Sequence, residues 1–149
     1  MFMRNITLFL FWWFLFFSIS TSSADNEINL DIDENGEYDA LSDGLLIIRY
    51  LFGLTGDDLV SGILGSNSLV VEPIEIKSKL DSMRANLDVD GNGSVDALTD
   101  GLLILRYLFG LRGDSLVTQV IGTGAARNSS ESIEDLSLIH ISEPTRPSS

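Results

Sequence analysis

Oxygen-bearing side chains recur at the same spacing in two short stretches of the sequence. They are Asp31, Asp33, Asn35, Asp39 and Asp43 in the first stretch, and Asp88, Asp90, Asn92, Asp96 and Asp100 in the second. Alternate residues of a curled loop point inward, and Ca²⁺ prefers six to eight oxygens at about 2.3–2.6 Å. A glycine, Gly36 or Gly93, stands at the sixth position, where such a loop turns sharply. The spacing predicts two calcium loops, in which the seventh position, Glu37 or Ser94, contributes its backbone carbonyl.

Other cations fit this set of side chains less well. Mg²⁺ demands a smaller octahedral cage, and soft metals prefer histidine or cysteine ligands. The chain has no cysteine, and its one histidine, His140, stands far from both stretches. A solvated acidic turn rich in asparagine and glycine is the simpler interpretation of one loop alone. Two loops with the same ladder favour calcium, which we expect as the cofactor at two sites.

The last carboxylate of each ladder leaves two arrangements open. The twelfth position, where a calcium loop ends on a carboxylate, holds Ser42 or Thr99, and an aspartate follows one residue later. In one arrangement the loop is one residue longer, and Asp43 or Asp100 closes the calcium cage. In the other, Ser42 or Thr99 caps the following helix, and the aspartate only favours the helix dipole. The first arrangement supplies the final anion of the cage and is the one we expect.

The two ladders belong to an internal repeat with an offset of 57 residues. Residues 30–62 and 87–119 are identical at 23 of 33 aligned positions, which indicates two copies of one structural unit. The division that follows is repeat 1 at 25–62, a linker and leading helix at 63–86, repeat 2 at 87–122, and the start of a possible third unit at 123–135. Pro73 suits the first turn of the leading helix. Its apolar face is predicted to hold Ile76, Leu80, Met83 and Leu87.

An apolar helix is predicted to follow each loop and to end at Gly53 or Gly110, where a left-handed cap is expected. Both helices are apolar on nearly every side, which indicates burial on more than one face. The expected fold is therefore all-α, with both helices packed against each other and against the leading helix. A second interpretation places part of these helices on a partner-binding surface, because arginine and tyrosine are favoured at interfaces. Its residues would be Arg49, Tyr50, Arg106 and Tyr107.

Each unit resembles the type I dockerin repeat, a calcium loop of the EF-hand type followed by one helix. The resemblance covers Asp31–Gly53 and Asp88–Gly110, in the pattern DxDxNGxxDAL followed by LRYLFG. It implies a module that binds a cohesin-like protein and tethers secreted glycan-degrading enzymes to a scaffold. The chain departs from that pattern in the late final carboxylate and in the well-formed leading helix.

The two ends of the chain differ in composition from the repeats. Residues 1–24 combine an early cation, Arg4, with a long apolar run and small residues before Ala24, which is typical of a cleaved export signal. Residues 136–149 begin with LSLIHISEPTR, which resembles the translation of a sequencing adapter, and we assign them no function. The remaining Asp25 to Asp135 carry 21 acidic and 7 basic residues. This net charge of −14 argues against binding to nucleic-acid backbones.

These observations predict a secreted, extracellular or periplasmic calcium-binding module that serves protein interaction or structural support. Without cysteine, and with no histidine inside the repeats, they offer no catalytic triad and no thiolate nucleophile. We therefore expect no enzyme activity within 25–135, and no membrane association after signal cleavage. Two alternatives remain: the non-catalytic N-terminal part of a secreted polysaccharide-degrading enzyme, and a calcium-stiffened spacer of a surface protein.

Overall fold

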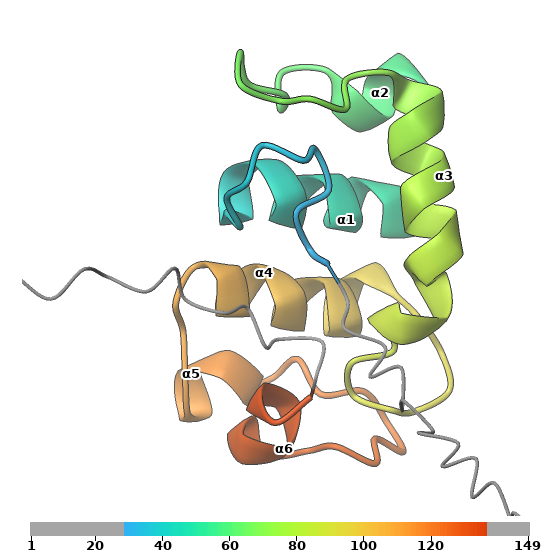
Figure 1. The fold of residues 1–149 in the computed structure, drawn as a ribbon. Coiled ribbons are helices and arrows are strands. Elements are labelled where there is room, and N and C mark those ends of the chain that lie inside the picture. Colours follow the sequence, from blue (N-terminus) through green and yellow to red (C-terminus); the bar gives the residue numbers. More distant parts are fainter. Residues whose placement is uncertain (1–28, 137–149) are drawn as a thin grey trace, which may run out of the picture.

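The computed structural model describes residues 29–136, which fold into helices joined by loops without a strand (Figure 1). The predicted all-α class is confirmed. The helices are α1 (Leu45–Leu51), α2 (Asp57–Val60), α3 (Pro73–Met83), α4 (Leu102–Leu108), α5 (Asp114–Val117) and α6 (Ser130–Glu134). The predicted export signal at 1–24 and all but the first residue of the predicted adapter-derived tail lie outside the described residues.

Each long loop enters its helix through one wide, π-helical turn. These turns span Ala40–Gly44 before α1 and Ala97–Gly101 before α4. The Gly44 amide donates to the Asp39 carbonyl over 3.2 Å, and the Gly101 amide donates to the Asp96 carbonyl over 3.1 Å. A π turn holds one residue more than an α turn. The residue by which each loop exceeds the usual calcium loop is therefore accommodated at the start of the helix.

The helices α1 and α4 lie side by side and antiparallel, at the centre of the molecule (Figure 1). A glycine at the start of each one faces the second half of the other. A Cβ placed on Gly44 would lie 2.7 Å from Leu105, and one placed on Gly101 would lie 3.1 Å from Ile48. Because these contacts are equivalent at an offset of 57, the two units are related by a pseudo-two-fold axis. The helices can approach this closely because Gly44 and Gly101 have no side chain.

Helix α3 connects the units and runs across the ends of both central helices (Figure 1). It begins at Pro73, as the sequence predicts, and a 3₁₀ turn, Arg84–Leu87, leads from it into the second acidic loop. The four residues predicted to share its apolar face are all buried: Ile76, Leu80, Met83 and Leu87. This helix therefore ties the first unit to the loop of the second.

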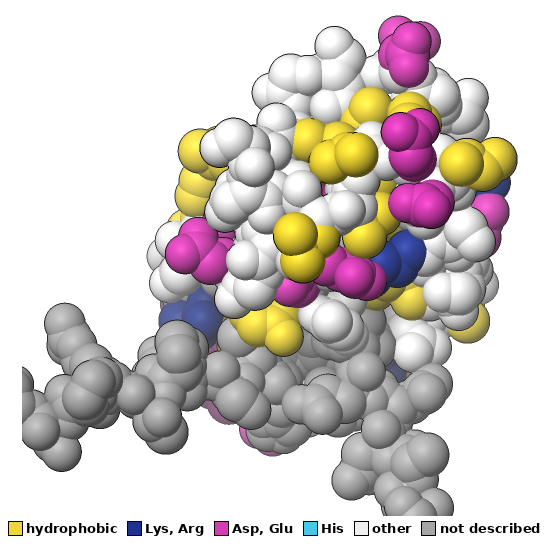
Figure 2. Space-filling view, turned by 45° about the horizontal axis from the view of Figure 1, so that its top comes forward, with side chains coloured by type: hydrophobic (Ala, Val, Ile, Leu, Met, Phe, Trp, Pro, Cys, Tyr) yellow, Lys and Arg dark blue, Asp and Glu magenta, His cyan; other side chains and the backbone are white. Residues whose placement is uncertain are grey.

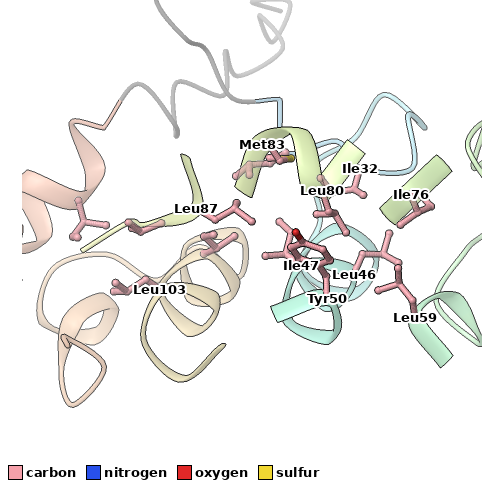
Figure 3. Packing of buried hydrophobic residues seen from close by; sticks show 14 of the residues in the cluster. Ile32, Leu46, Ile47, Tyr50, Leu59, Ile76, Leu80, Met83, Leu87 and Leu103 are labelled. Carbon is pink, nitrogen blue, oxygen red and sulfur yellow. The ribbon is translucent and has the colours of Figure 1, made fainter. Parts of the chain in front are cut away.

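One hydrophobic core extends through both units (Figure 3). Residues at equivalent positions of the two copies fill it, so the repeat in sequence is a repeat in packing. The equivalent buried pairs are Leu30 and Leu87, Ile32 and Val89, Leu46 and Leu103, Ile47 and Ile104, and Leu59 and Leu116. Each of these side chains is at most 2% exposed. The loop residues Ile32 and Val89 anchor the acidic loops directly to this core.

The chain leaves each central helix through a glycine in the left-handed conformation, as predicted. Gly53 has φ +84° and Gly110 has φ +81°. The next residue, Leu54 or Leu111, donates its amide to the carbonyl of Arg49 or Arg106, which is the bond of a Schellman cap. The caps direct the chain into the short helices α2 and α5, which the sequence analysis did not predict.

Helix α6 begins at Ser130, the residue that corresponds to Pro73 at the offset of 57. Its Ile133 is fully buried, as is the corresponding Ile76 of α3. Leu136, the first residue of the predicted tail, packs partly buried against the core. Within 29–136, no helix combines the length and the apolar character needed to cross a membrane.

Candidate metal centres

The first acidic loop brings three aspartates together beneath its turn. One carboxylate oxygen each from Asp31, Asp33 and Asp43 lies within 4.8 Å of the others. All three residues are buried, at 8%, 0% and 0% exposure. Asp31 curls the loop, because its two oxygens accept the backbone amides of Asn35 and Gly36, each over 3.0 Å. Asp31 and Asp33, at the first and third positions of the ladder, thus lie next to Asp43.

The second loop repeats this arrangement with Asp88, Asp90 and Asp100. Asp90 and Asp100 are fully buried, and Asp88 is half-buried. The amides of Asn92 and Gly93 donate to the two oxygens of Asp88, over 3.1 and 3.0 Å. The same backbone curl therefore forms twice from the same residue types. Gly36 and Gly93 both have φ +85°, the left-handed turn that the sequence predicts at this position.

The closing aspartates turn back into their loops. Asp43 accepts the Ile32 amide over 2.6 Å and the Asp39 amide over 3.0 Å. Asp100 accepts the Val89 amide over 2.7 Å and the Asp96 amide over 3.0 Å. The π turn makes this geometry possible, because its extra residue rotates the aspartate toward the loop. Of the two arrangements left open by the sequence, the structure has the one with the aspartate inside the longer loop.

Asp39 and Asp96, at the ninth loop position, cap the helical turns. One oxygen of Asp39 accepts the amides of Leu41 and Ser42 over 2.9 and 2.8 Å, and the other accepts the Ser42 hydroxyl over 2.8 Å. Asp96 accepts the two equivalent amides. The cap is therefore the ninth position rather than Ser42 or Thr99. Neither Asp39 nor Asp96 belongs to a cluster of three carboxylates among the residues that the structure describes.

The amide side chains at the fifth position also stabilise the loops. The Asn35 Oδ1 accepts the Glu37 amide over 2.7 Å, and the Asn92 Oδ1 accepts the Ser94 amide over 2.7 Å. In each loop the asparagine Nδ2 lies 3.4 Å from an aspartate oxygen of the third position. Glu37 and Ser94 are exposed. These residues line the rim of each loop, and the three aspartates form its interior.

Burial makes negative charge costly inside both clusters. Desolvation raises the pKa of Asp43 to about 7, and the neighbouring Asp33 and Asp31 add to the rise, against two backbone hydrogen bonds that lower it. Desolvation also raises the pKa of Asp100, with a further contribution from Asp90. Three carboxylates so close together repel one another when all are ionised. A cation between them would supply the missing opposite charge.

One basic side chain crosses the backbone of each loop, and it comes from a different place in each unit. The Lys79 Nζ of α3 donates to the Asp31 carbonyl over 2.5 Å and pairs with Glu34 at 3.1 Å. In the second unit, Arg127 donates to the carbonyls of Asp88 and Val89 over 2.5 and 2.6 Å. The sequence analysis missed both residues, because they do not correspond at the offset of 57.

The segments that follow α2 and α5 each donate one hydrogen bond to a clustered aspartate, again from different groups. The Ser68 hydroxyl donates to the Asp33 Oδ2 over 2.6 Å. In the second unit, the backbone amide of Gly122 donates to the Asp90 Oδ2 over 2.7 Å. A Cβ on Gly122 would lie 2.6 Å from this oxygen and 2.3 Å from the Asn92 Nδ2. At the second cluster the neighbouring group is therefore a backbone amide with no room for a side chain. The sequence analysis treated both segments only as linkers.

The residues assigned to a partner surface have structural roles. Arg49 donates to the carbonyls of Asp58, Leu59 and Ser61 at the end of α2, and Arg106 donates to the equivalent carbonyls after α5. Tyr50 is 7% exposed and donates its hydroxyl to Asp81 over 2.8 Å. Tyr50 therefore packs in the core, and its place on a partner-binding surface stays a prediction. Tyr107 is half-buried, with Arg112 stacked 3.6 Å from its ring centre.

Comparisons with known proteins identify no relative of this chain. Neither the protein-family models, nor the curated proteins, nor the solved structures contain a match to the chain.

Proposed function

We propose that the chain is a calcium-binding module built from two loop–helix units of the EF-hand type. The observation that carries the proposal is the pair of carboxylate triads, Asp31, Asp33 and Asp43, and Asp88, Asp90 and Asp100. Each triad combines three acidic groups within 4.8 Å, and it forms twice from equivalent residues; all of these aspartates are buried except Asp88, which is half-buried. Buried charges are paired or bind metals, because desolvation is otherwise too costly.

The donor set favours calcium over other cations. Every side chain proposed as a ligand in the two loops offers a carboxylate or amide oxygen, which hard cations prefer. The backbone carbonyls of Glu37 and Ser94 and the side chains of Asn35 and Asn92 line the rims and add further oxygens. A loop with so many oxygens suits the six to eight ligands of calcium better than the six of magnesium. Asp39 and Asp96 contribute to the proposed sites by holding the helix entrance, and through water at the rim.

Bound calcium would also stabilise the fold. The loops are attached to the core through Ile32 and Val89, so a cation that fixes a loop fixes part of the core as well. A ligand that binds only the folded state stabilises it by about 2.7 kcal/mol at a hundredfold excess over its dissociation constant. For a small domain whose stability is about 5–15 kcal/mol, two such sites are a large contribution.

The proposal is tested by titrating calcium into the wild type and into Asp43→Ala and Asp100→Ala by calorimetry. We expect two sites in the wild type and one in each variant. Asp58→Ala is the matched control, because it removes an equal charge from an exposed position outside the loops. Unchanged calcium binding in both loop variants, or an equal loss in the control, would overturn the assignment.

A role in protein interaction, as in the dockerins that the repeats resemble, is the second part of the proposal. Each unit exposes a leucine in the π turn before its central helix and a phenylalanine at the residue after that helix. Leu41 is 67% and Leu98 64% exposed, and Phe52 and Phe109 are 58% and 54% exposed. Exposed apolar residues arranged by a pseudo-two-fold axis suit a partner surface better than the arginines and tyrosine bound within the fold.

This second part makes the module a secreted, non-catalytic tether that binds a cohesin-like protein. Its test is a pull-down from the secreted fraction with calcium and with chelator. The wild type should retain a protein partner only with calcium. The double variant Leu41→Ser, Leu98→Ser should lose that partner without losing calcium. Retention by the double variant would contradict the surface and leave the calcium sites untouched.

A further inference from the structure

The segment between α2 and α3, together with the first turn of α3, exposes three large apolar side chains. Leu69 is 77%, Val71 47% and Ile74 76% exposed. We call these three residues the linker patch. At the offset of 57, the second unit has Ala126, Asn128 and Glu131 in their places. The fold therefore does not require apolar residues here, since its second copy is built without them.

A groove of about 550 Å³ lies beside the linker patch, between the first acidic loop and α3. The groove is shallow and open to solvent. Figure 2 shows apolar and acidic side chains next to one another on this side of the molecule. The groove is lined by Glu34, Val70, Glu75, Ser78, Lys79 and Ser82.

The second unit shows what can fill the equivalent place. Val70 and Arg127 correspond at the offset of 57, and their backbones are held alike. The Val70 amide donates to the Asp33 carbonyl over 3.0 Å, and the Arg127 amide donates to the Asp90 carbonyl over 2.9 Å. The Arg127 guanidinium then lies on the loop and donates to two of its carbonyls. Val70 is too short to do so, and the groove remains open beside it.

The charges around the groove favour a cationic occupant. Lys79, its one basic lining residue, is already bound by Glu34 and by the Asp31 carbonyl. Glu75 takes part in no ion pair with the residues described. The carboxylate of Glu34 is still half exposed, at 53%. An incoming guanidinium would meet two carboxylates, and arginine forms strong, directional bonds with such groups.

We propose that this groove binds an arginine side chain of a protein partner, while the linker patch contacts the apolar residues on either side of that arginine. The occupant would place a guanidinium beside the first loop in trans, as Arg127 places one on the second loop in cis, although Lys79 already binds the Asp31 carbonyl. The surface uses none of the exposed leucines and phenylalanines proposed above for a cohesin-like partner. It adjoins the first proposed calcium site, because Glu34 belongs to that loop and Lys79 donates to the Asp31 carbonyl.

The probe is the peptide acetyl-Leu-Leu-Arg-Leu-amide, added to ¹⁵N-labelled protein and followed by NMR. We expect shift changes at the backbone amides of 69–71 and 74–82. The same peptide with glutamine in place of arginine should bind at least tenfold more weakly. Shift changes confined to other residues, no shift changes, or equal binding of both peptides would overturn the proposal.

Two variants use the second unit as a template. Val70→Arg should place a guanidinium in the groove, as Arg127 places one on the second loop, and should weaken peptide binding at least tenfold. The triple variant Leu69→Ala, Val71→Asn, Ile74→Glu introduces the residues of the second unit and should have a similar effect. Circular dichroism checks that both variants keep the wild-type helical spectrum. Because the triple variant copies a sequence that already folds here, it keeps the test valid if Val70→Arg does not fold.

A second copy of the chain is the competing occupant. Analytical ultracentrifugation of the wild type and the triple variant separates the two cases. We expect both proteins to sediment as monomers at the peptide-binding concentration. A wild-type dimer that the triple variant abolishes would assign the patch to self-association and overturn the proposal.

Discussion

The first and second units share one framework but differ in how that framework is completed. Both have the carboxylate triad, the π turn, the left-handed cap and the arginine bound to the end of a short helix. They differ in the basic residue over the loop, Lys79 or Arg127, and in the group above the triad, Ser68 or Gly122. The shared part is set by packing and by the loop's need for oxygen ligands. The different part lies where the chain meets solvent.

The shared framework predicts one function in both units, and the difference predicts a further function in the first unit alone. The two triads should bind the same cation, because the same groups surround them. The apolar residues of the linker patch occur in the first unit alone, so any partner that uses them binds the module in one orientation. Variants made in pairs, one in each unit, therefore test the comparison directly.

The largest effect is expected on removal of calcium, which acts on both units at once. At a hundredfold excess of calcium over each dissociation constant, the two sites together contribute about 5 kcal/mol to stability. Chelation should therefore lower the melting temperature sharply or unfold the chain, as measured by circular dichroism at the helical band. A helical spectrum and a melting temperature indifferent to chelator would contradict calcium-coupled folding.

Truncation of an equivalent core pair should affect both units almost equally. Leu46 and Leu103 are each fully buried at the centre of the core. Replacing either by alanine should cost about 2–5 kcal/mol, because it removes buried apolar surface and leaves a cavity. Denaturant unfolding measures both variants. A loss confined to one unit would show that the core is not shared between the copies.

The glycines above the triads should respond differently to the same substitution. Gly122→Ala places a methyl group against Asp90 and Asn92 and should weaken the second calcium site about tenfold, or about 1.4 kcal/mol. The equivalent Gly65→Ala meets only the Asn67 side chain and should leave the first site nearly unchanged. Calcium titration of both variants measures the contrast. Equal effects would show that the triads are closed in the same way after all.

The smallest effect is expected at the arginines that bind the short helices. Arg49→Met and Arg106→Met keep most of the apolar stem but remove the hydrogen bonds to the carbonyls after α2 and α5. Each should cost about 1 kcal/mol of unfolding free energy, because these bonds lie largely in solvent and a typical hydrogen bond contributes about 0.5–1.5 kcal/mol net. Loss of a partner in a pull-down, without loss of stability, would instead support their placement on an interaction surface.

The repeat framework could be predicted from the sequence because it is local and periodic. The ladder spacing, the turn at Gly36 and the face of α3 depend on residues a few positions apart. The longer loop with Asp43 inside is expected from the need for a final anion, although a capped helix uses the same residues. In the structure the π turn holds the extra residue, and Asp43 accepts two amides of its own loop.

Long-range contacts account for the features that the sequence did not indicate. Arg49 has the composition of an interface residue, yet it binds carbonyls nine to twelve positions later. Lys79 reaches a loop 48 positions earlier, and no spacing rule connects the two. Tyr50 is buried in the core, where its hydroxyl donates to Asp81 of α3, 31 positions later. Such contacts follow from how α3 crosses the first unit.

The most direct test of the central claim is a crystal structure of the protein grown with calcium, with anomalous scattering data. The account predicts one calcium peak among Asp31, Asp33 and Asp43 and another among Asp88, Asp90 and Asp100. Each ion should have oxygen ligands at about 2.3–2.6 Å. Empty triads, or calcium found only at exposed residues such as Glu37, would contradict it.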